Sequence, residues 1–263
     1  MDLMLKDKRA LVAGASRGLG HALALGLARE GCRLAINGRD GSRLKAAAEN
    51  ISAESGVQVV GLAGDVSDAS VPGRLIDAAV EALGGLDLLV TNAGGPPAGA
   101  FESFDEPAWQ KAIDLSLMSH VRLIRAALPH LRRSQAASVL TMTSYTAKQP
   151  MPNLVLSNSI RLATIGLTKS LALELGAEGI RFNSILPATV DTDRVRELAQ
   201  FRADRDKTSL LEEQAKDAQK SVLGRIGRPE EFANVAVFLL SPAASYVTGM
   251  MMVVDGGQYK GMM

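Results

Sequence analysis

Short runs of apolar residues alternate along the chain with longer stretches in which apolar residues recur every three or four positions. The short runs are almost continuously hydrophobic, which is typical of strands covered on both faces of a parallel sheet. The longer stretches predict amphipathic helices. In the first of them Leu19, Leu23 and Leu27 share one face, and Gly31 marks its end. The predicted strands cover residues 9–13, 34–36, 57–60, 86–90, 138–142, 180–186 and 251–254.

This alternation predicts an α/β protein with a single doubly wound Rossmann fold. Right-handed crossovers would give a seven-stranded parallel sheet with helices on both faces. The longest helical stretches lie at about 107–133 and 155–177. The 263 residues suit one such domain, and no repeat or linker divides them. We therefore expect residues 1–263 to form one nucleotide-binding domain.

One segment departs from the alternation. Residues 191–220 are rich in charge, poor in β-branched residues and favourable to helix. Because ligands of a doubly wound sheet bind beyond the carboxyl ends of the strands, a helical insertion after the sixth strand would lie over the ligand site. We predict a lid here, with a solvated surface hairpin as the alternative.

The composition narrows the classes of protein. Hydrophobic residues make up 47% and charged residues 22%, which favours a large core over disorder. The net charge is +1 and no basic stripe or long apolar run occurs, so we expect neither a nucleic acid nor a membrane as partner. Cys32 is the only cysteine and no signal-peptide pattern opens the chain, so we expect a cytoplasmic location. His21, His120 and His130 lack metal-ligand spacing, and no metal site is predicted.

A glycine-rich segment stands between the first predicted strand and the first predicted helix. It reads Gly14-Ala15-Ser16-Arg17-Gly18-Leu19-Gly20. In this context glycines allow a tight turn and let the backbone approach a pyrophosphate, while the helix N-terminus offers free N–H groups. The segment predicts a dinucleotide site, with an ordinary glycine-rich turn as the alternative.

The spacing of these glycines resembles the short-chain dehydrogenase/reductase family, especially its 3-oxoacyl-carrier-protein reductase branch. Further blocks that resemble the family follow in order: Asp65-Val66, Asn92-Ala93-Gly94, and residues 183–188, 246–249 and 254–257. The resemblance covers essentially the whole chain. It implies a homotetramer or homodimer. The cofactor contacts that it implies are Gly14, Ser16, Arg17, Gly18, Leu19, Gly20, Asn37, Gly38, Arg39, Asp65, Val66, Asn92, Ala93, Gly94, Arg161, Pro187, Ala188, Val190 and Thr192.

The end of the second predicted strand indicates which nicotinamide cofactor binds. An NAD enzyme places a carboxylate there for the ribose 2′-hydroxyl. In the family register this position is Gly38, whereas Arg17 and Arg39 can reach the same corner. Because a guanidinium suits a 2′-phosphate, we predict NADP(H), with NAD(H) as the alternative. The alternative interpretation is that Arg39 is a solvated surface charge and that Asp40 only caps the next helix.

The resemblance also implies four catalytic positions, of which one matches the family. Ser144 ends the fifth strand where the family has its catalytic serine. The helix block 166–172 fixes the register and places Ser157 at the tyrosine position and Arg161 at the lysine position. Ser116 stands where the family has asparagine.

These departures change the expected chemistry. A phenol has a pKa of about 10, whereas a serine hydroxyl is far less acidic and therefore a poor general acid. General acid–base catalysis contributes roughly 10²–10⁴-fold to the reaction rate. Arg161 keeps a positive charge, and its spacing from Ser157 puts both on one helix face. Tyr145 is the candidate substitute acid, with a packed loop aromatic as the alternative. Lys148 is a lesser candidate, and a solvated lysine is its alternative.

The prediction is therefore an NADP(H)-dependent oxidoreductase that interconverts a carbonyl and an alcohol on a small carbonyl or acyl-thioester substrate. The absence of the tyrosine and the lysine supports a second hypothesis, a catalytically weak NADP(H)-binding sensor or subunit. A third is a lyase or isomerase that uses the fold without net redox change.

Overall fold

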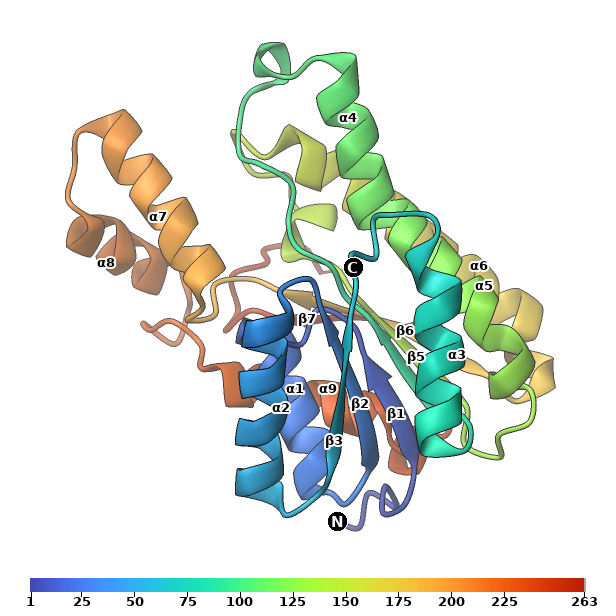
Figure 1. The fold of residues 1–263 in the computed structure, drawn as a ribbon. Helices are drawn as coiled ribbons and strands as arrows, with labels where there is room; N and C mark the ends of the chain where they lie inside the picture. Colours follow the sequence, from blue (N-terminus) through green and yellow to red (C-terminus); the bar gives the residue numbers. More distant parts are fainter. Residues whose placement is uncertain (263) are drawn as a thin grey trace.

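The structure is a computed structural model that describes residues 1–262. Within them, seven parallel strands form one sheet in the order β3-β2-β1-β4-β5-β6-β7 (Figure 1). This confirms the predicted doubly wound fold. The order reverses between β1 and β4, which is where such sheets open a ligand crevice. The strands are β1 (Arg9–Val12), β2 (Arg33–Gly38), β3 (Val59–Ala63), β4 (Leu88–Thr91), β5 (Ser138–Met142), β6 (Arg181–Pro187) and β7 (Met251–Val254).

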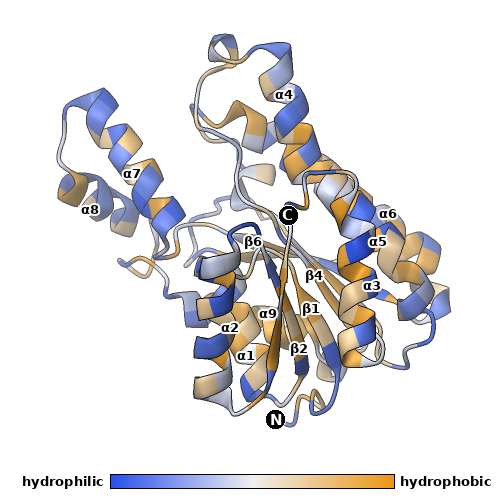
Figure 2. Ribbon diagram, in the orientation of Figure 1, coloured by the Kyte–Doolittle hydropathy of each residue, from blue (hydrophilic) through white to orange (hydrophobic). Residues whose placement is uncertain are grey.

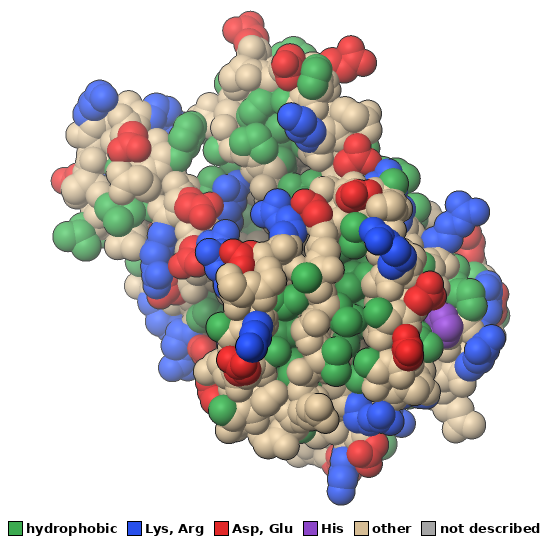
Figure 3. All heavy atoms as spheres, in the orientation of Figure 1, with side chains coloured by type: hydrophobic (Ala, Val, Ile, Leu, Met, Phe, Trp, Pro, Cys, Tyr) green, Lys and Arg blue, Asp and Glu red, His purple; other side chains and the backbone are tan. Residues whose placement is uncertain are grey.

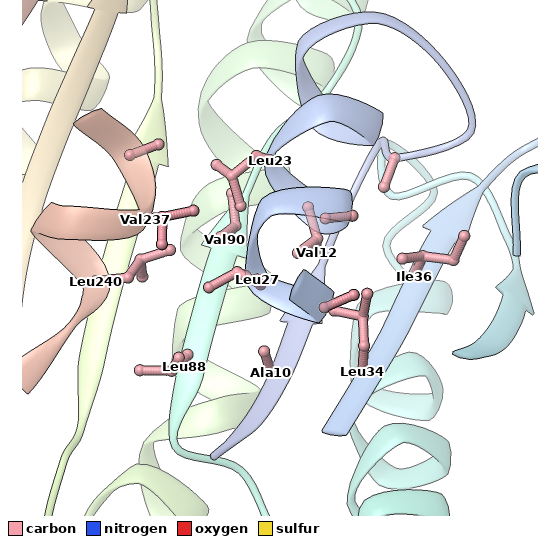
Figure 4. Close-up of a cluster of buried hydrophobic side chains, with 14 of the residues drawn as sticks. Ala10, Val12, Leu23, Leu27, Leu34, Ile36, Leu88, Val90, Val237 and Leu240 are labelled. Atoms are coloured by element: carbon pink, nitrogen blue, oxygen red, sulfur yellow. The ribbon is translucent and has the colours of Figure 1, made fainter. Parts of the chain in front are cut away.

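Helices cover both faces of the sheet, because successive strand side chains point to opposite sides. Ala10 and Val12 of β1 belong to a cluster with buried residues of α1, α2 and α9. Figure 4 shows those of α1 and α9. Leu11 faces α3, α5 and α6. The strands therefore carry apolar residues on both sides. Figure 2 shows how apolar the central strands are. The helices are α1 (Gly18–Arg29), α2 (Gly41–Ser55), α3 (Val71–Leu83), α4 (Glu106–Ile113), α5 (Ser119–Leu131), α6 (Val155–Leu175), α7 (Asp193–Asp206), α8 (Leu210–Lys220) and α9 (Pro229–Leu240).

Several predicted bounds differ from the structure: β2 spans Arg33–Gly38 rather than 34–36, and β4 begins at Leu88 rather than at residue 86. Two further differences have an identifiable local cause. The third strand begins at Val59 rather than at residue 57, because Gly56 ends α2 in the left-handed conformation and the pairing with β2 starts at Val59. The predicted helix at 107–133 is interrupted by a π-helical turn, Asp114–Met118, between α4 and α5. Ser116 lies in this turn, and its carbonyl accepts a hydrogen bond from Thr164 of α6 at 2.6 Å.

The charged segment after β6 forms a helical hairpin, α7 and α8, that projects from the body of the protein (Figure 1). Arg202 of α7 holds the two helices together, with ion pairs to Glu213 at 3.0 Å and to Asp217 of α8. Both carboxylates are buried. Hydrogen bonds from Lys216 and Arg202 lower the pKa of Glu213 to about 2.

At the opposite end of the sheet, Asp87 ties the start of β4 to the start of β1. Arg9 donates to both carboxylate oxygens, at 2.8 and 2.7 Å, and Ser134 donates as well. Burial opposes ionisation of Asp87, but the hydrogen bonds from Arg9 and Ser134 outweigh it and lower the pKa of Asp87 to about 2.

We expect this carboxylate to make folding pH-dependent. The folded-state pKa lies below the ordinary value of 3.8, so the stabilisation is complete above that pH and is lost as the pH falls through about 2. Asp87→Asn should lower the unfolding free energy by about 1–3 kcal/mol at neutral pH, because Arg9 loses its charged partner. Urea unfolding across pH 2–7 measures both effects. The exposed carboxylate of Asp77 provides the control, and Asp77→Asn should leave stability unchanged.

Candidate active site

A cleft of about 690 Å³ opens at the carboxyl ends of the strands, between the glycine loop, the loops after β4 and β5, and α7. Figure 3 shows the hollow beside the projecting hairpin, with Lys and Arg side chains gathered around it. The structure brings most of the predicted site residues together there. Those that line the cleft are Gly14, Arg17, Gly18, Leu19, Gly20, Arg39, Asn92, Ala93, Gly94, Ser144, Tyr145, Ser157, Arg161, Pro187, Ala188, Val190 and Thr192.

The glycine loop is shaped for close backbone approach. Gly14 and Gly18 both have φ near +60°, a conformation that favours glycine. A Cβ on Gly20 would lie 2.3 Å from the Gly14 carbonyl oxygen, so only glycine fits there. Asn92 supports the loop, since its side-chain amide donates to the same carbonyl at 3.0 Å. No side chain caps the N-terminus of α1, so its first N–H groups stay available to an anion.

Gly38, at the end of β2, stands at the position where an NAD enzyme has a carboxylate, and the structure gives a reason for the glycine. A Cβ on Gly38 would lie 2.9 Å from the Cβ of Ser16, so the Ser16 side chain occupies the room that a residue larger than glycine needs. Arg39 is exposed beside it, and its guanidinium lies 3.7 Å from Asp65. Arg39 therefore lies at the corner after β2 beside Asp65, whereas the guanidinium of Arg17 is paired with Asp193 at 3.1 Å and with Glu197 at 3.8 Å. Both arginines line the cleft.

The remaining predicted residues do not line the cleft. The Asn37 amide donates to the carbonyls of Leu62 and Gly64, which ties β2 to β3. Val66 is buried in the core. Ser116 is buried within the π-helical turn, and its hydroxyl has no hydrogen-bond partner among residues 1–262. The six predicted residues that do not line the cleft are Ser16, Asn37, Gly38, Asp65, Val66 and Ser116.

The loop after β5 carries the predicted serine. Ser144 caps a 3₁₀ turn, Tyr145–Ala147, and its hydroxyl accepts from the backbone N–H of Thr146 at 3.2 Å. That bond leaves the Ser144 proton available to a ligand in the cleft. Thr146, which the sequence did not single out, places its hydroxyl 3.1 Å from that of Ser157.

Arg161 lies one turn after Ser157 on α6 and is 9% exposed. Its Nη1 donates to the Thr143 carbonyl at 3.0 Å. Burial, with a contribution from the positive charge of Arg194, lowers the pKa of Arg161 to about 10. The guanidinium therefore remains charged at neutral pH.

The two substitute proton donors are placed differently. Tyr145 lines the cleft, but it is 7% exposed, and burial together with the negative charge of Asp255 raises its pKa. A raised pKa makes the phenol a weaker acid. Lys148 lies outside the cleft lining, with its ammonium 5.2 Å from the centre of the Tyr259 ring.

Two further polar residues of the site were not predicted. Arg194 of α7 lines the cleft, and its Nη2 donates to the Pro96 carbonyl at 2.6 Å. His120 is fully buried, with Nδ1 at 2.7 Å from the Thr91 hydroxyl. Burial and the charge of Arg161 lower the pKa of His120 to about 3, which keeps the imidazole neutral. Arg194 lies in a helix rich in charged residues and His120 in a largely apolar helix, so the sequence pattern did not mark either of them as a site residue.

Two kinds of feature were not found in residues 1–262. No three acidic, histidine or cysteine side chains lie together as a metal site would require. No helix in that range combines the length and the apolar character needed to cross a bilayer.

A parallel doubly wound sheet with this glycine loop defines a Rossmann-type nucleotide-binding protein. The family model described as enoyl-(acyl carrier protein) reductase matches residues 14–258. The 3-oxoacyl-[acyl-carrier-protein] reductase of Staphylococcus aureus is 34% identical over 260 residues, 97% of this chain and 100% of that protein. The chain belongs to the short-chain dehydrogenase/reductase family and is an oxidoreductase of that type.

Solved structures agree with this assignment. L-sorbose reductase from Gluconobacter frateurii, in complex with NADPH and L-sorbose, is 30% identical with a TM-score of 0.94, over 100% of both chains. A short-chain oxidoreductase from Pseudomonas aeruginosa with an atypical catalytic centre, in its NADPH-bound form, is 32% identical with a TM-score of 0.87. That match covers 97% of this chain and 99% of the other.

Proposed function

We propose that this protein is an NADP(H)-dependent short-chain reductase that interconverts a carbonyl and an alcohol through an altered active site. The observation that carries the proposal is the single cleft that joins the glycine loop to Ser144 and Arg161. The two relatives that were solved with NADPH support the cofactor. The names of the relatives include a sugar reductase and an acyl-carrier reductase, so the substrate is proposed only as a small carbonyl compound or acyl thioester.

The residues present fit the cofactor. The glycine loop and the uncapped start of α1 would hold the pyrophosphate. Arg17 and Arg39 would hold the 2′-phosphate, because Gly38 offers no carboxylate to an NAD ribose. Residues 187–192 and Arg161 would face the nicotinamide nucleotide. When bound, NADPH supplies the hydride.

The residues near Ser144 would bind the substrate carbonyl and assist proton transfer to it. Its hydroxyl would donate to the substrate carbonyl oxygen, and the charge of Arg161 would stabilise the negative charge that develops there. Ser157 and Thr146 would hold a water molecule or the substrate oxygen between their hydroxyls. Since Arg161 stays charged and the pKa of Tyr145 is raised, the proposed proton source is water, with Tyr145 as the alternative.

We also propose that Ser157 and Arg161 stand at the family's tyrosine and lysine positions, with Ser116 at its asparagine position. The helical spacing, one turn on the cleft side of α6, supports this register for Ser157 and Arg161. The small side chain of Ser157 leaves room that a tyrosine would fill.

The hairpin α7–α8 is proposed as the lid of the site. Its Val195, Leu198 and Phe201 line the cleft, and Arg194 contacts the loop after β4. Arg202→Met should loosen it, because two buried carboxylates lose their shared cation. We expect hydrogen exchange of residues 193–220 to speed up on the order of tenfold, and kcat/KM to fall with it.

The control for the lid is Arg205→Met, since Arg205 is exposed and paired only with its neighbour Asp206. Hydrogen-exchange mass spectrometry compares the two variants. Exchange in Arg202→Met that equals that of the control would show that the ion pairs do not order the hairpin.

A homotetramer or homodimer is proposed from the surface of α6. Leu162 and Leu173 are 56% and 76% exposed. They lie eleven positions apart, about three helical turns, and so share one face. A helix face with exposed leucines suits a second copy of the chain.

Titration with NADPH, followed by turnover of ketones and acyl thioesters, tests the function. NADPH oxidation with at least one of these substrates supports the reductase. Tight NADPH binding without turnover on any substrate favours the sensor or subunit instead, which the departures at Ser157 and Arg161 make the second candidate.

A further inference from the structure

The guanidinium of Arg161 is the least compensated charge of the cleft. It is nine-tenths buried, and no ion pair joins it to a carboxylate anywhere in residues 1–262. One of its five N–H donors bonds the Thr143 carbonyl. Burying a charge without an opposite charge is costly, so such a group is retained where a ligand completes it.

The other cations of the cleft have partners. Arg202 and Lys220 bind the carboxylates of α8, and Arg205 binds Asp206. The acidic residues of the lining are likewise engaged with cations other than Arg161: Asp193 with Arg17 and Arg196, Glu197 with Arg17 and Arg194, and Asp217 with Arg202 and Lys220.

The surroundings of Arg161 add positive charge and hydroxyl groups. Arg194 faces the same space and contributes to the electrostatics of Arg161. Ser144 and Ser157 bring hydroxyls to the same end of the cleft. This end therefore carries the unpaired cation Arg161, a second cation, Arg194, that is itself paired with Glu197, and neutral donors, a lining that suits an anion.

We infer that the substrate is an oxo acid and that Arg161 binds the carboxylate next to the reacting carbonyl. The planar fork of a guanidinium matches a carboxylate with two parallel hydrogen bonds. Four N–H donors remain after the bond to Thr143, enough for a carboxylate on one edge and a cofactor ribose hydroxyl on the other. The inference rests on the proposed reductase function and names its substrate class.

Malonate and its uncharged analogue malonamide test the inference by calorimetry, with and without NADP⁺. We expect malonate to bind at least about tenfold more tightly, in line with a charge-assisted bidentate contact. Arg161→Gln should abolish the preference and Arg161→Lys should retain part of it. Arg205→Gln, which removes a paired cation of the same cleft, should keep it in full.

Equal binding of malonate and malonamide by the unmodified protein would overturn the inference, and so would tighter binding of inorganic phosphate than of malonate by the protein saturated with NADP⁺. The comparison of malonate with malonamide in the unmodified protein tests the carboxylate preference even if Arg161→Gln does not fold. NADPH affinity is measured separately by fluorescence. If the protein binds NADPH but does not prefer malonate, only the inference of an oxo-acid substrate is contradicted. If it fails to bind NADPH, the proposed reductase function is contradicted.

Discussion

Gly20→Ala is expected to lower the affinity for NADPH by about tenfold to a hundredfold, the effect of losing a hydrogen bond of about 1.5–3 kcal/mol to a charged group. The added Cβ would lie 2.3 Å from the Gly14 carbonyl oxygen and 3.0 Å from the Asn92 amide nitrogen. The first contact is with backbone, so the loop itself has to move. The N–H groups at the start of α1 would then no longer converge on the pyrophosphate.

Gly41→Ala is the matched control for this prediction. Gly41 also opens a helix, α2, but a Cβ there meets no atom within 4 Å. This variant should bind NADPH as the unmodified protein does. Fluorescence titration gives both affinities, and thermal unfolding shows whether each variant is folded. A folded Gly20→Ala protein with unchanged affinity would place the pyrophosphate elsewhere.

Ser144→Ala is expected to lower kcat by about 10²–10³-fold, the usual loss when one donor to a developing oxyanion is removed. Its hydroxyl lies in the cleft lining at the end of β5 and has a proton to donate. The affinity for NADPH should stay nearly the same, because the proposed cofactor contacts do not include Ser144.

The hydroxyl of Ser144 also caps the turn that follows, so a structural effect has to be separated from a catalytic one. Loss of a cap lowers stability by about 1 kcal/mol. Thermal unfolding measures this part. Ser159→Ala, at an exposed position of α6, should leave both kcat and stability unchanged. If Ser144→Ala retained full kcat, the carbonyl oxygen would have to be held by another group, with Ser157 the nearest candidate.

The sheet could be predicted from the sequence because its strands are buried on both faces. Runs such as residues 138–142 are continuously apolar or small, and the structure places β5 at those positions. The third strand was misplaced by two residues, since Val57 is as apolar as Val59. Only the pairing with Leu34 of β2 decides where the strand begins.

The site could be predicted where neighbouring residues carry the signal. The glycine loop and Ser144 belong to short motifs, and the structure brings both to one cleft. The reason for Gly38 could not be predicted, because the side chain that fills its space, Ser16, comes from another loop. Arg194 meets the carbonyl of Pro96 across nearly a hundred residues, a contact that no local pattern encodes.

The charge state of the site also depends on the folded environment. From the sequence alone, Arg161 and His120 would be expected to have the ordinary pKa values of their residue types. Burial beside each other lowers the pKa of His120 to about 3 and leaves Arg161 as the charged partner. Neither the burial nor the proximity could be read from two residues that are forty-one positions apart.

The most direct test of the account compares NADPH with NADH in fluorescence titrations of the unmodified protein. The glycine loop, the absence of a carboxylate at Gly38, and the presence of Arg17 and Arg39 in the lining of the same cleft predict that NADPH binds at least about tenfold more tightly. Arg39→Leu should reduce that preference. Binding of neither nucleotide would contradict the central claim that this cleft is a nicotinamide cofactor site, and a preference for NADH would contradict the assignment of Arg17 and Arg39 to the 2′-phosphate.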